Sequence, residues 1–228
     1  MPPKANAQSQ RTAARAYIQP LGNKWIKNNR IMKISPKYSS ENWKSICLNI
    51  NSPLDDWKTA INIFEDRISG RFLNQVKLIE NNTFSGFAVM ALDCLLIETL
   101  NQFWFGIDDT NECYRGRNWQ SFRDFFKRSN HFYTFFPDDV SKVFYDQVRC
   151  GLLHQAETKQ GTLINFKKST MVNKIDPLDI NKGLEVNRKL FHAALIKEFE
   201  DYCKKLLDSN ESTMRENFIK KMNSICRC

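Results

Sequence analysis

Arg149 and His154 are the residues of this chain whose types and spacing are best suited to chemistry. They lie five positions apart in the run VRCGLLH, residues 148–154. A guanidinium binds a phosphate through two parallel hydrogen bonds and stabilises negative charge that develops on it, and an imidazole transfers a proton near neutral pH. The two groups together are suited to cleaving a phosphate ester without a metal ion or a cofactor.

The spacing also sets a geometric condition on this pair. Five positions rotate a regular helix by about 140°, so on a rigid helix the two side chains do not share a face. A helix end distorted beside Gly151, or a groove shared between two chains, would bring them together.

Two carboxylates are candidate partners for Arg149. Asp93 and Glu98 are the only charged residues between Phe84 and Phe105, and a buried carboxylate needs a partner or must be neutral. We expect Arg149 to pair with one of them. A purely structural interpretation stays open, in which this ion pair only fixes the packing of the helices and His154 is a core histidine with its own partners.

The motif resembles the Arg-x4-His signature of HEPN (higher eukaryotes and prokaryotes nucleotide-binding) domains. It would lie on the penultimate helix of an all-α bundle, after an acidic residue on an earlier buried helix and before a long helix that ends in a Phe-x-x-Tyr pattern, Phe199 to Tyr202. The resemblance covers roughly residues 55–207. Cys150 departs from the polar residue that often follows the arginine in this family.

The resemblance implies a metal-independent endoribonuclease of an antiviral defence or toxin-antitoxin system, acting on RNA as a homodimer. His154 would be the acid or base at the ribose 2′-hydroxyl or at the leaving oxygen, Arg149 would hold the scissile phosphate, and Glu98 or Asp93 would orient Arg149. The product would end in a 2′,3′-cyclic phosphate. An antitoxin or regulatory protein is a further implied partner.

Two other classes of function remain open. The first is a catalytically silent HEPN-like module that binds nucleic acid or a partner protein. The second is a structural subunit of a larger defence complex, for which a large exposed apolar patch remote from the motif would be diagnostic.

Basic and aromatic residues alternate between Tyr114 and Phe136, a combination that suits single-stranded RNA. A surface seldom carries so many aromatic residues, so most of them should be core. This interpretation leaves Arg123 and Lys127, four positions apart, as an exposed basic face and candidate substrate-binding residues.

Other candidate sites have simpler explanations. Cys150 and His154 would form half of a metal site, but no second pair with ligand spacing follows, so no metal site is expected. His131 and His192 are interpreted as structural or surface residues. The three Asp-Asp pairs, at 55/56, 108/109 and 138/139, each lie at a turn or helix start, where carboxylates favour the helix dipole.

Five helices are expected to position these residues. Apolar residues at helical spacing predict helices over 53–79, 84–105, 118–129, 137–152 and 182–207. Residues 161–166 would form a strand or one arm of a short β-hairpin between the last two helices, and residues 44–51 could form another strand. The fold class expected is all-α, an up-and-down bundle of four to five helices.

Composition and charge limit the class of protein and indicate how the chain is divided. The chain has 228 residues, 42% of them apolar, and only eight glycines, which excludes collagen-like and wholly disordered classes. Eight of its 34 basic residues precede the first acidic residue, Glu41, and the remaining 26 are balanced by 25 acidic residues. We therefore expect a basic N-terminal arm over 1–40, a helical domain over 41–208 and a C-terminal tail over 209–228.

The setting of the protein is also predicted. An odd number of cysteines without a Cys-x-x-Cys pair, together with the lack of an apolar leader, indicates a reducing, cytoplasmic environment. The apolar run 84–105 contains two carboxylates that are costly in lipid, so it is interpreted as a buried helix rather than a membrane segment.

Overall fold

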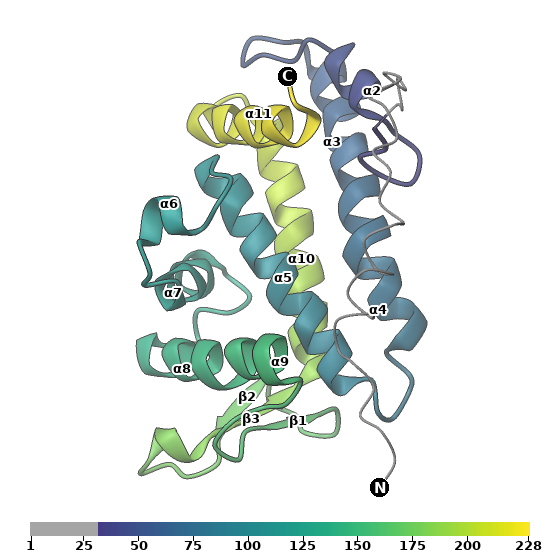
Figure 1. The fold of residues 1–228 in the computed structure, drawn as a ribbon. Coiled ribbons are helices and arrows are strands. Elements are labelled where there is room, and N and C mark those ends of the chain that lie inside the picture. Colours follow the sequence, from purple (N-terminus) through teal and green to yellow (C-terminus); the bar gives the residue numbers. More distant parts are fainter. Residues whose placement is uncertain (1–31) are drawn as a thin grey trace, which may run out of the picture. The chain divides into compact units, whose positions relative to one another are not determined.

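The protein is mainly helical with one small three-stranded sheet (Figure 1). The computed structural model describes residues 32–228, so most of the expected basic arm lies outside the described residues. The helical class expected from the sequence is confirmed at this level, and the sheet is an addition to it.

Helix α5, Gly86–Phe105, is the central helix, as its apolar composition predicts. It contacts α7, α9, α10 and α11, and Met90, Cys94 and Phe103 are fully buried. Its length and apolar composition would allow it to cross a membrane, and half of its most apolar window is buried in the protein. Its two carboxylates are both paired with side chains of other helical segments, which agrees with a core helix.

The first predicted helix is continuous but has a widened turn. Helix α3, Leu54–Ile68, passes through the π-helical segment η1, Ser69–Leu73, into α4, Asn74–Ile79. Gly70 lies in this widened turn, and a Cβ atom there would collide with the ring of Pro36. The glycine therefore allows residues that precede the predicted domain to pack closely against it.

The middle of the chain folds around a cluster of phenylalanines. The elements here are α6 (Asn111–Tyr114), α7 (Trp119–Arg128), α8 (Asp138–Val143), the π-helical segment η2 (Phe144–Arg149) and α9 (Cys150–Gln155). Phe126 stacks on Phe136 with ring centroids 4.1 Å apart, and Phe144 stacks on Phe191 of α10, Arg188–Leu207, at 5.2 Å. The interpretation of the aromatic segment as mostly core is confirmed.

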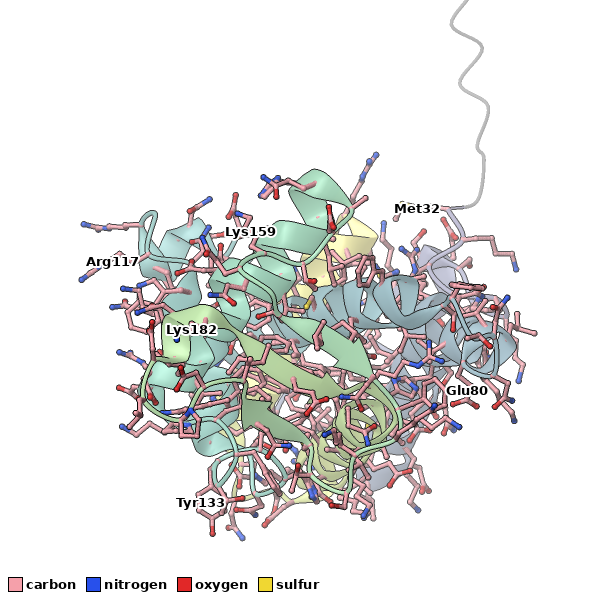
Figure 2. All side chains as sticks on the ribbon, turned by 90° about the horizontal axis from the view of Figure 1, so that it is seen from below. Met32, Glu80, Arg117, Tyr133, Lys159 and Lys182 are labelled. Carbon is pink, nitrogen blue, oxygen red and sulfur yellow. The ribbon has the colours of Figure 1, made fainter. Side chains whose placement is uncertain are left out.

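The expected hairpin is instead part of a sheet of three strands in the order β1-β3-β2. Strands β1 (Leu163–Asn165) and β3 (Leu184–Asn187) are parallel, and β2 (Val172–Lys174) is antiparallel to β3. The 3-10 turn η3, Ile180–Lys182, leads into β3. Figure 2 is viewed from the end of the molecule that carries the sheet and shows the strands in front of the helices.

The start of the last helix and the second expected strand both differ from the prediction. The last predicted helix was expected to begin at residue 182, but β3 occupies its first turns because Leu184 and Val186 alternate into the core. Helix α10 begins only after Asn187, whose side chain accepts hydrogen bonds from the first free N–H groups. Residues 45–51 form turns and irregular backbone rather than the second expected strand.

The ends of the described chain are also more ordered than expected. In place of a C-terminal tail, residues 212–226 form α11, Ser212–Cys226, with Met214, Phe218 and Met222 buried at four-residue intervals. At the other end Ile34 is buried, and α2, Ser40–Lys44, packs against α11. The packed part of the chain therefore extends before residue 41 and beyond residue 208.

Candidate functional site

The motif lies where a π-helical segment passes into a short α-helix. Segment η2 ends at Arg149 and α9 carries His154. The widened segment is held by Gln147, whose carbonyl oxygen accepts from the N–H of Lys159 at 3.0 Å. Its side-chain oxygen accepts from the Thr162 hydroxyl at 2.5 Å, and its amide donates to the carbonyl of Asn181 at 3.1 Å. The loop and sheet after α9 therefore fix the helix that presents Arg149.

Helix α9 is short because the chain turns back tightly against it. A Cβ atom at Gly151 would collide with the backbone carbonyl of Glu157, and Ala156 ends the helix in the left-handed region at a φ of 55°. This close return leaves His154 on the last turn of the helix, where its side chain is exposed.

Arg149 pairs with Glu98 of α5. Its Nε donates to Oε1 of Glu98 at 2.6 Å, and each side chain is 18% exposed. Burial lowers the pKa of Arg149, but the hydrogen bond and charge of Glu98 outweigh it and hold that pKa above its ordinary value. The guanidinium is therefore permanently charged and accessible at its edge.

Tyr145 completes the surroundings of Arg149. The Arg149 guanidinium carbon lies 5.4 Å from the centre of the tyrosine ring. Burial raises the pKa of Tyr145 to about 12, although the nearby charge of Arg149 lowers it in part. The sequence reasoning missed this residue, which stands four positions before Arg149 and is therefore on the same side of a helix.

The structure corrects the expected geometry of the Arg149 and His154 pair. The helical distortion lies before Arg149, over residues 144–149, and the turns between the two residues are α-helical. The rotation of about 140° between them therefore stays, so within one chain the two side chains leave the helical backbone in different directions.

His154 is not the core histidine of the structural interpretation. It is exposed, and its imidazole makes no hydrogen bond to any residue between 32 and 228. A free imidazole on a short helix end is accessible to a ligand.

The second candidate partner of Arg149 is engaged elsewhere. Asp93 is 1% exposed, and its Oδ1 lies 2.7 Å from Nδ1 of His192 on α10. Burial raises the pKa of Asp93, and the hydrogen bond and charge of His192 lower it only in part. Asp93 therefore does not orient Arg149, and His192, which had no partner assigned from the sequence, is a buried structural residue.

The two cations of the predicted basic face on α7 differ: within residues 32–228, Lys127 has no ion-pair partner and Arg123 has one. Lys127 is exposed. Arg123 forms an ion pair with the neighbouring Asp124 at 2.7 Å and lies 5.4 Å from the Trp119 ring. Both residues belong to α7, whereas Arg149 belongs to η2.

The residue after Lys127 has a different role. Arg128 lies 4.7 Å over the Trp104 ring and donates to the side-chain oxygen of Asn101 at 2.6 Å. Burial lowers its pKa to about 10. This arginine therefore joins α7 to α5 and belongs to the packing of the fold.

Comparison of the chain with protein-family models, curated proteins and solved structures found no match.

The described residues include no cluster suited to a metal ion. Between residues 32 and 228, no three histidine, cysteine, aspartate or glutamate side chains converge as ligands would. The groups available for chemistry at this site are the Arg149 guanidinium, the His154 imidazole and the carboxylate of Glu98.

Proposed function

We propose that this chain is a metal-independent endoribonuclease in which Arg149 and His154 act on RNA and Glu98 positions Arg149. The observation that carries the proposal is the Glu98–Arg149 ion pair, held at the edge of the core and followed five positions later by an exposed imidazole that has no hydrogen-bond partner within residues 32–228. A carboxylate that orients Arg149 is what the resemblance to HEPN ribonucleases leads one to expect, and Glu98 would have that role.

The ion pair leaves the two terminal nitrogens of the Arg149 guanidinium available to bind a ligand. Glu98 takes the Nε hydrogen, and the two terminal nitrogens donate to no residue of the described chain. A guanidinium held in this way presents a fork of N–H groups that matches two oxygens of a phosphate. Arg149 would hold the scissile phosphate and stabilise the charge of its transition state.

His154 would supply proton transfer. Its imidazole takes the proton of the ribose 2′-hydroxyl, the 2′-oxygen attacks the phosphorus, and the bond from phosphorus to the 5′-oxygen breaks. The 5′-oxygen leaves with a proton from solvent, the imidazolium returns its proton to solvent, and the other product ends in a 2′,3′-cyclic phosphate. No metal ion takes part in these steps.

A second copy of the chain would complete the site, because Arg149 and His154 of one copy diverge. Helix α5 offers a surface for it: Phe87 and Glu98 lie about 20° apart around the helix, and Leu95 lies one turn before Glu98. Leu95 is 40% exposed, and Phe87 is exposed to the same degree. Pairing two copies on this apolar stripe would bring both Arg149 residues to one groove.

The proposal also includes an assignment of the helices to a bundle. We interpret α3, α5, α10 and the η2–α9 segment as the core of an up-and-down HEPN-like bundle. The small sheet and α11 would be additions to it. A cytoplasmic defence or toxin-antitoxin role, with an antitoxin or other regulator as partner, follows from this interpretation.

A silent binding module is the second candidate. The divergence of Arg149 and His154 within one chain favours it, because a single copy does not place both groups on one phosphate. In that case Arg149 would serve the packing of η2 against α5, and His154 would have no role in chemistry.

Cleavage of a labelled mixed-sequence RNA in excess EDTA distinguishes the two. We expect wild-type protein to cut, His154→Ala to lose at least about 100-fold in rate, and Arg149→Ala to lose a comparable factor. Glu98→Gln, which keeps an acceptor but loses the charge, should fall in between. Gln155→Ala, an exposed neighbour on α9, is the matched control and should cut like wild type.

Two results would refute the metal-independent nuclease. One is cleavage that EDTA abolishes, and the other is a His154→Ala protein that cuts at the wild-type rate. A cut at a position where the RNA carries a 2′-deoxy sugar would also exclude the proposed attack.

A further inference from the structure

An exposed aromatic ring surrounded by cations lies at the sheet end of the molecule. Phe166 follows β1 and is 39% exposed. The cationic groups of Arg188, Lys189 and Lys167 lie 5.2, 5.7 and 5.9 Å from the centre of its ring. These four residues are here called the Phe166 surface.

Arg188 is the unusual member of the Phe166 surface. It is 3% exposed, and within residues 32–228 it has no carboxylate partner. Its terminal nitrogens donate to neutral oxygens, the Ser85 hydroxyl at 2.7 Å and the carbonyls of Asn82 and Glu80 at 3.0 and 3.2 Å. Its Nε is buried and has no hydrogen-bond partner in the described part of the chain. A buried charge without a counter-ion is costly and leaves a positive potential directly beneath Phe166.

The two lysines of the Phe166 surface are free to meet an anion. Lys167 and Lys189 are both exposed, and neither forms an ion pair with a residue of the described chain. Their neighbour Lys168 is different, because it is paired with Glu185 at 3.3 Å. Two exposed positive charges are therefore available next to the ring.

A second exposed aromatic residue adjoins this surface. Phe84 is 95% exposed, the highest exposure of any aromatic residue between 32 and 228. It lies in the turn between α4 and α5, and the hydrogen bonds of Arg188 to Asn82 and Ser85 hold the two sides of this turn. Figure 1 shows this turn at the same end of the molecule as β1, and Glu80, at the end of α4, is labelled in Figure 2.

We propose that the Phe166 surface and Phe84 bind single-stranded RNA. An exposed ring offers a face on which a base stacks, and flanking lysines contact the phosphates on either side, the combination that proteins use to hold unpaired nucleic acid. A duplex has no free base faces and would gain only the phosphate contacts. Arg188 holds Phe166 in place and adds its charge below the ring.

The position of the Phe166 surface relates it to the proposed catalytic groups. Gly86, at the start of α5, packs against Arg188 and Ile164, and Glu98 lies twelve positions further along the same helix, about 18 Å. A strand with its scissile phosphate on Arg149 would have to cover this rise and also turn about 120° around α5 to reach the Phe166 surface. As a site for the substrate of a nuclease it rests on the proposed function, but its binding of RNA does not require cleavage.

The test is therefore a binding measurement on the full chain with RNA that cannot be cut. A labelled 2′-O-methyl oligonucleotide has no 2′-hydroxyl to attack, and its fluorescence anisotropy reports affinity. We expect Phe166→Ala to weaken binding by about 5- to 150-fold, the loss of one stacked base. Phe135→Ala removes a ring of the same 39% exposure on another surface and should change affinity less than twofold.

A second variant tests the phosphate contact and does not depend on the ring. Lys189→Ala should lower the slope of log Kd against log salt concentration by about 0.7, the value for one phosphate contact on a single strand. Lys204→Ala, an exposed lysine toward the other end of α10, should leave the slope unchanged. Circular dichroism and thermal melting of each variant confirm that it is folded.

Three results would overturn the proposal: equal losses in Phe166→Ala and Phe135→Ala, an unchanged salt slope in Lys189→Ala, or displacement of the oligonucleotide by AMP at equal concentration. The last result would make a free nucleotide the ligand. Phe166-dependent binding without cleavage of unmodified RNA supports the binding site and refutes the nuclease. Cleavage of RNA together with binding that does not depend on Phe166 supports the nuclease and refutes the binding site.

Discussion

At the scale of single residues, the two carboxylates of α5 have different roles because of helical rotation. Asp93 and Glu98 are five positions apart, so they point about 140° away from each other. Glu98 reaches Arg149, and Asp93 reaches His192 on α10. One arginine therefore could not have used both, and the more deeply buried carboxylate is the one paired with a histidine.

This assignment predicts how stability depends on pH. Because burial raises the pKa of Asp93 in the folded state, folding favours its protonated form. The contribution of Asp93 is then fully present below its unfolded pKa of 3.8 and is lost as the pH rises through the folded pKa. Asp93→Asn, which keeps an oxygen for His192, should gain stability relative to wild type as the pH rises above about 4.

Urea unfolding of both proteins at a series of pH values measures this difference. Asp201→Asn is a useful comparison, because the hydrogen bond from His131 lowers the pKa of that exposed carboxyl. Its stability relative to wild type should fall as the pH rises. If the Asp93→Asn difference is constant across the series, the shift assigned to Asp93 is wrong.

At the scale of elements, the segment that carries the motif depends on the loop that follows it. Segment η2 is tied to that loop through Gln147, and α9 is packed against the returning backbone at Gly151. Helical propensity does not favour a π-helical segment, so tertiary contacts have to hold it. The position of Arg149 is thus a property of the helix, the loop and the sheet together.

Gly151→Ala tests this dependence. The added methyl group meets the carbonyl of Glu157, which is backbone and cannot rotate away, so we expect a loss of about 1–3 kcal/mol in the free energy of unfolding. Gln155→Ala on the same helix should change it by less than about 0.5 kcal/mol. Urea denaturation measures both, and equal stability of the two variants would mean that the loop moves freely.

At the scale of the whole molecule, the most apolar helix is not fully covered. The face of α5 that carries Phe87 and Leu95 is exposed beside the Glu98–Arg149 pair. Exposed apolar surface of this kind marks an interface when it is contiguous. Its position agrees with the proposal that two copies meet across the candidate site.

Leu95→Glu is the variant that tests this interface. A carboxylate there would be buried against the second copy and would lie one turn from Glu98, so the dimer Kd should rise by at least about 30-fold. Sedimentation equilibrium measures the change. Leu178→Glu, at an almost fully exposed leucine of the β2–β3 connection, should have no effect. A wild-type protein that is monomeric at all accessible concentrations would rule the interface out.

The sequence by itself determined most of the helices and the identity of the candidate pair. The periodicity of α3, α5, α7 and α10 is local, and so is the Arg149 to His154 spacing, so both are visible without a fold. The aromatic core between Tyr114 and Phe136 followed from composition. The apolar run 84–105 contains only two carboxylates, so the candidate partners of Arg149 were limited to Asp93 and Glu98.

Only the tertiary structure decided the rest, because the contacts concerned join distant parts of the chain. Strand β3 was predicted as helix because an apolar alternation over four residues is too short to distinguish a strand from a helix. Its pairing with β1 joins residues about twenty positions apart in the sequence. Helix α11 is stable because its apolar side packs against α2 and α5. Three features of the site depend on which elements meet, and no local pattern specifies that. They are the pairing of Arg149 with Glu98 rather than Asp93, the π-helical segment before Arg149, and the three cations around Phe166.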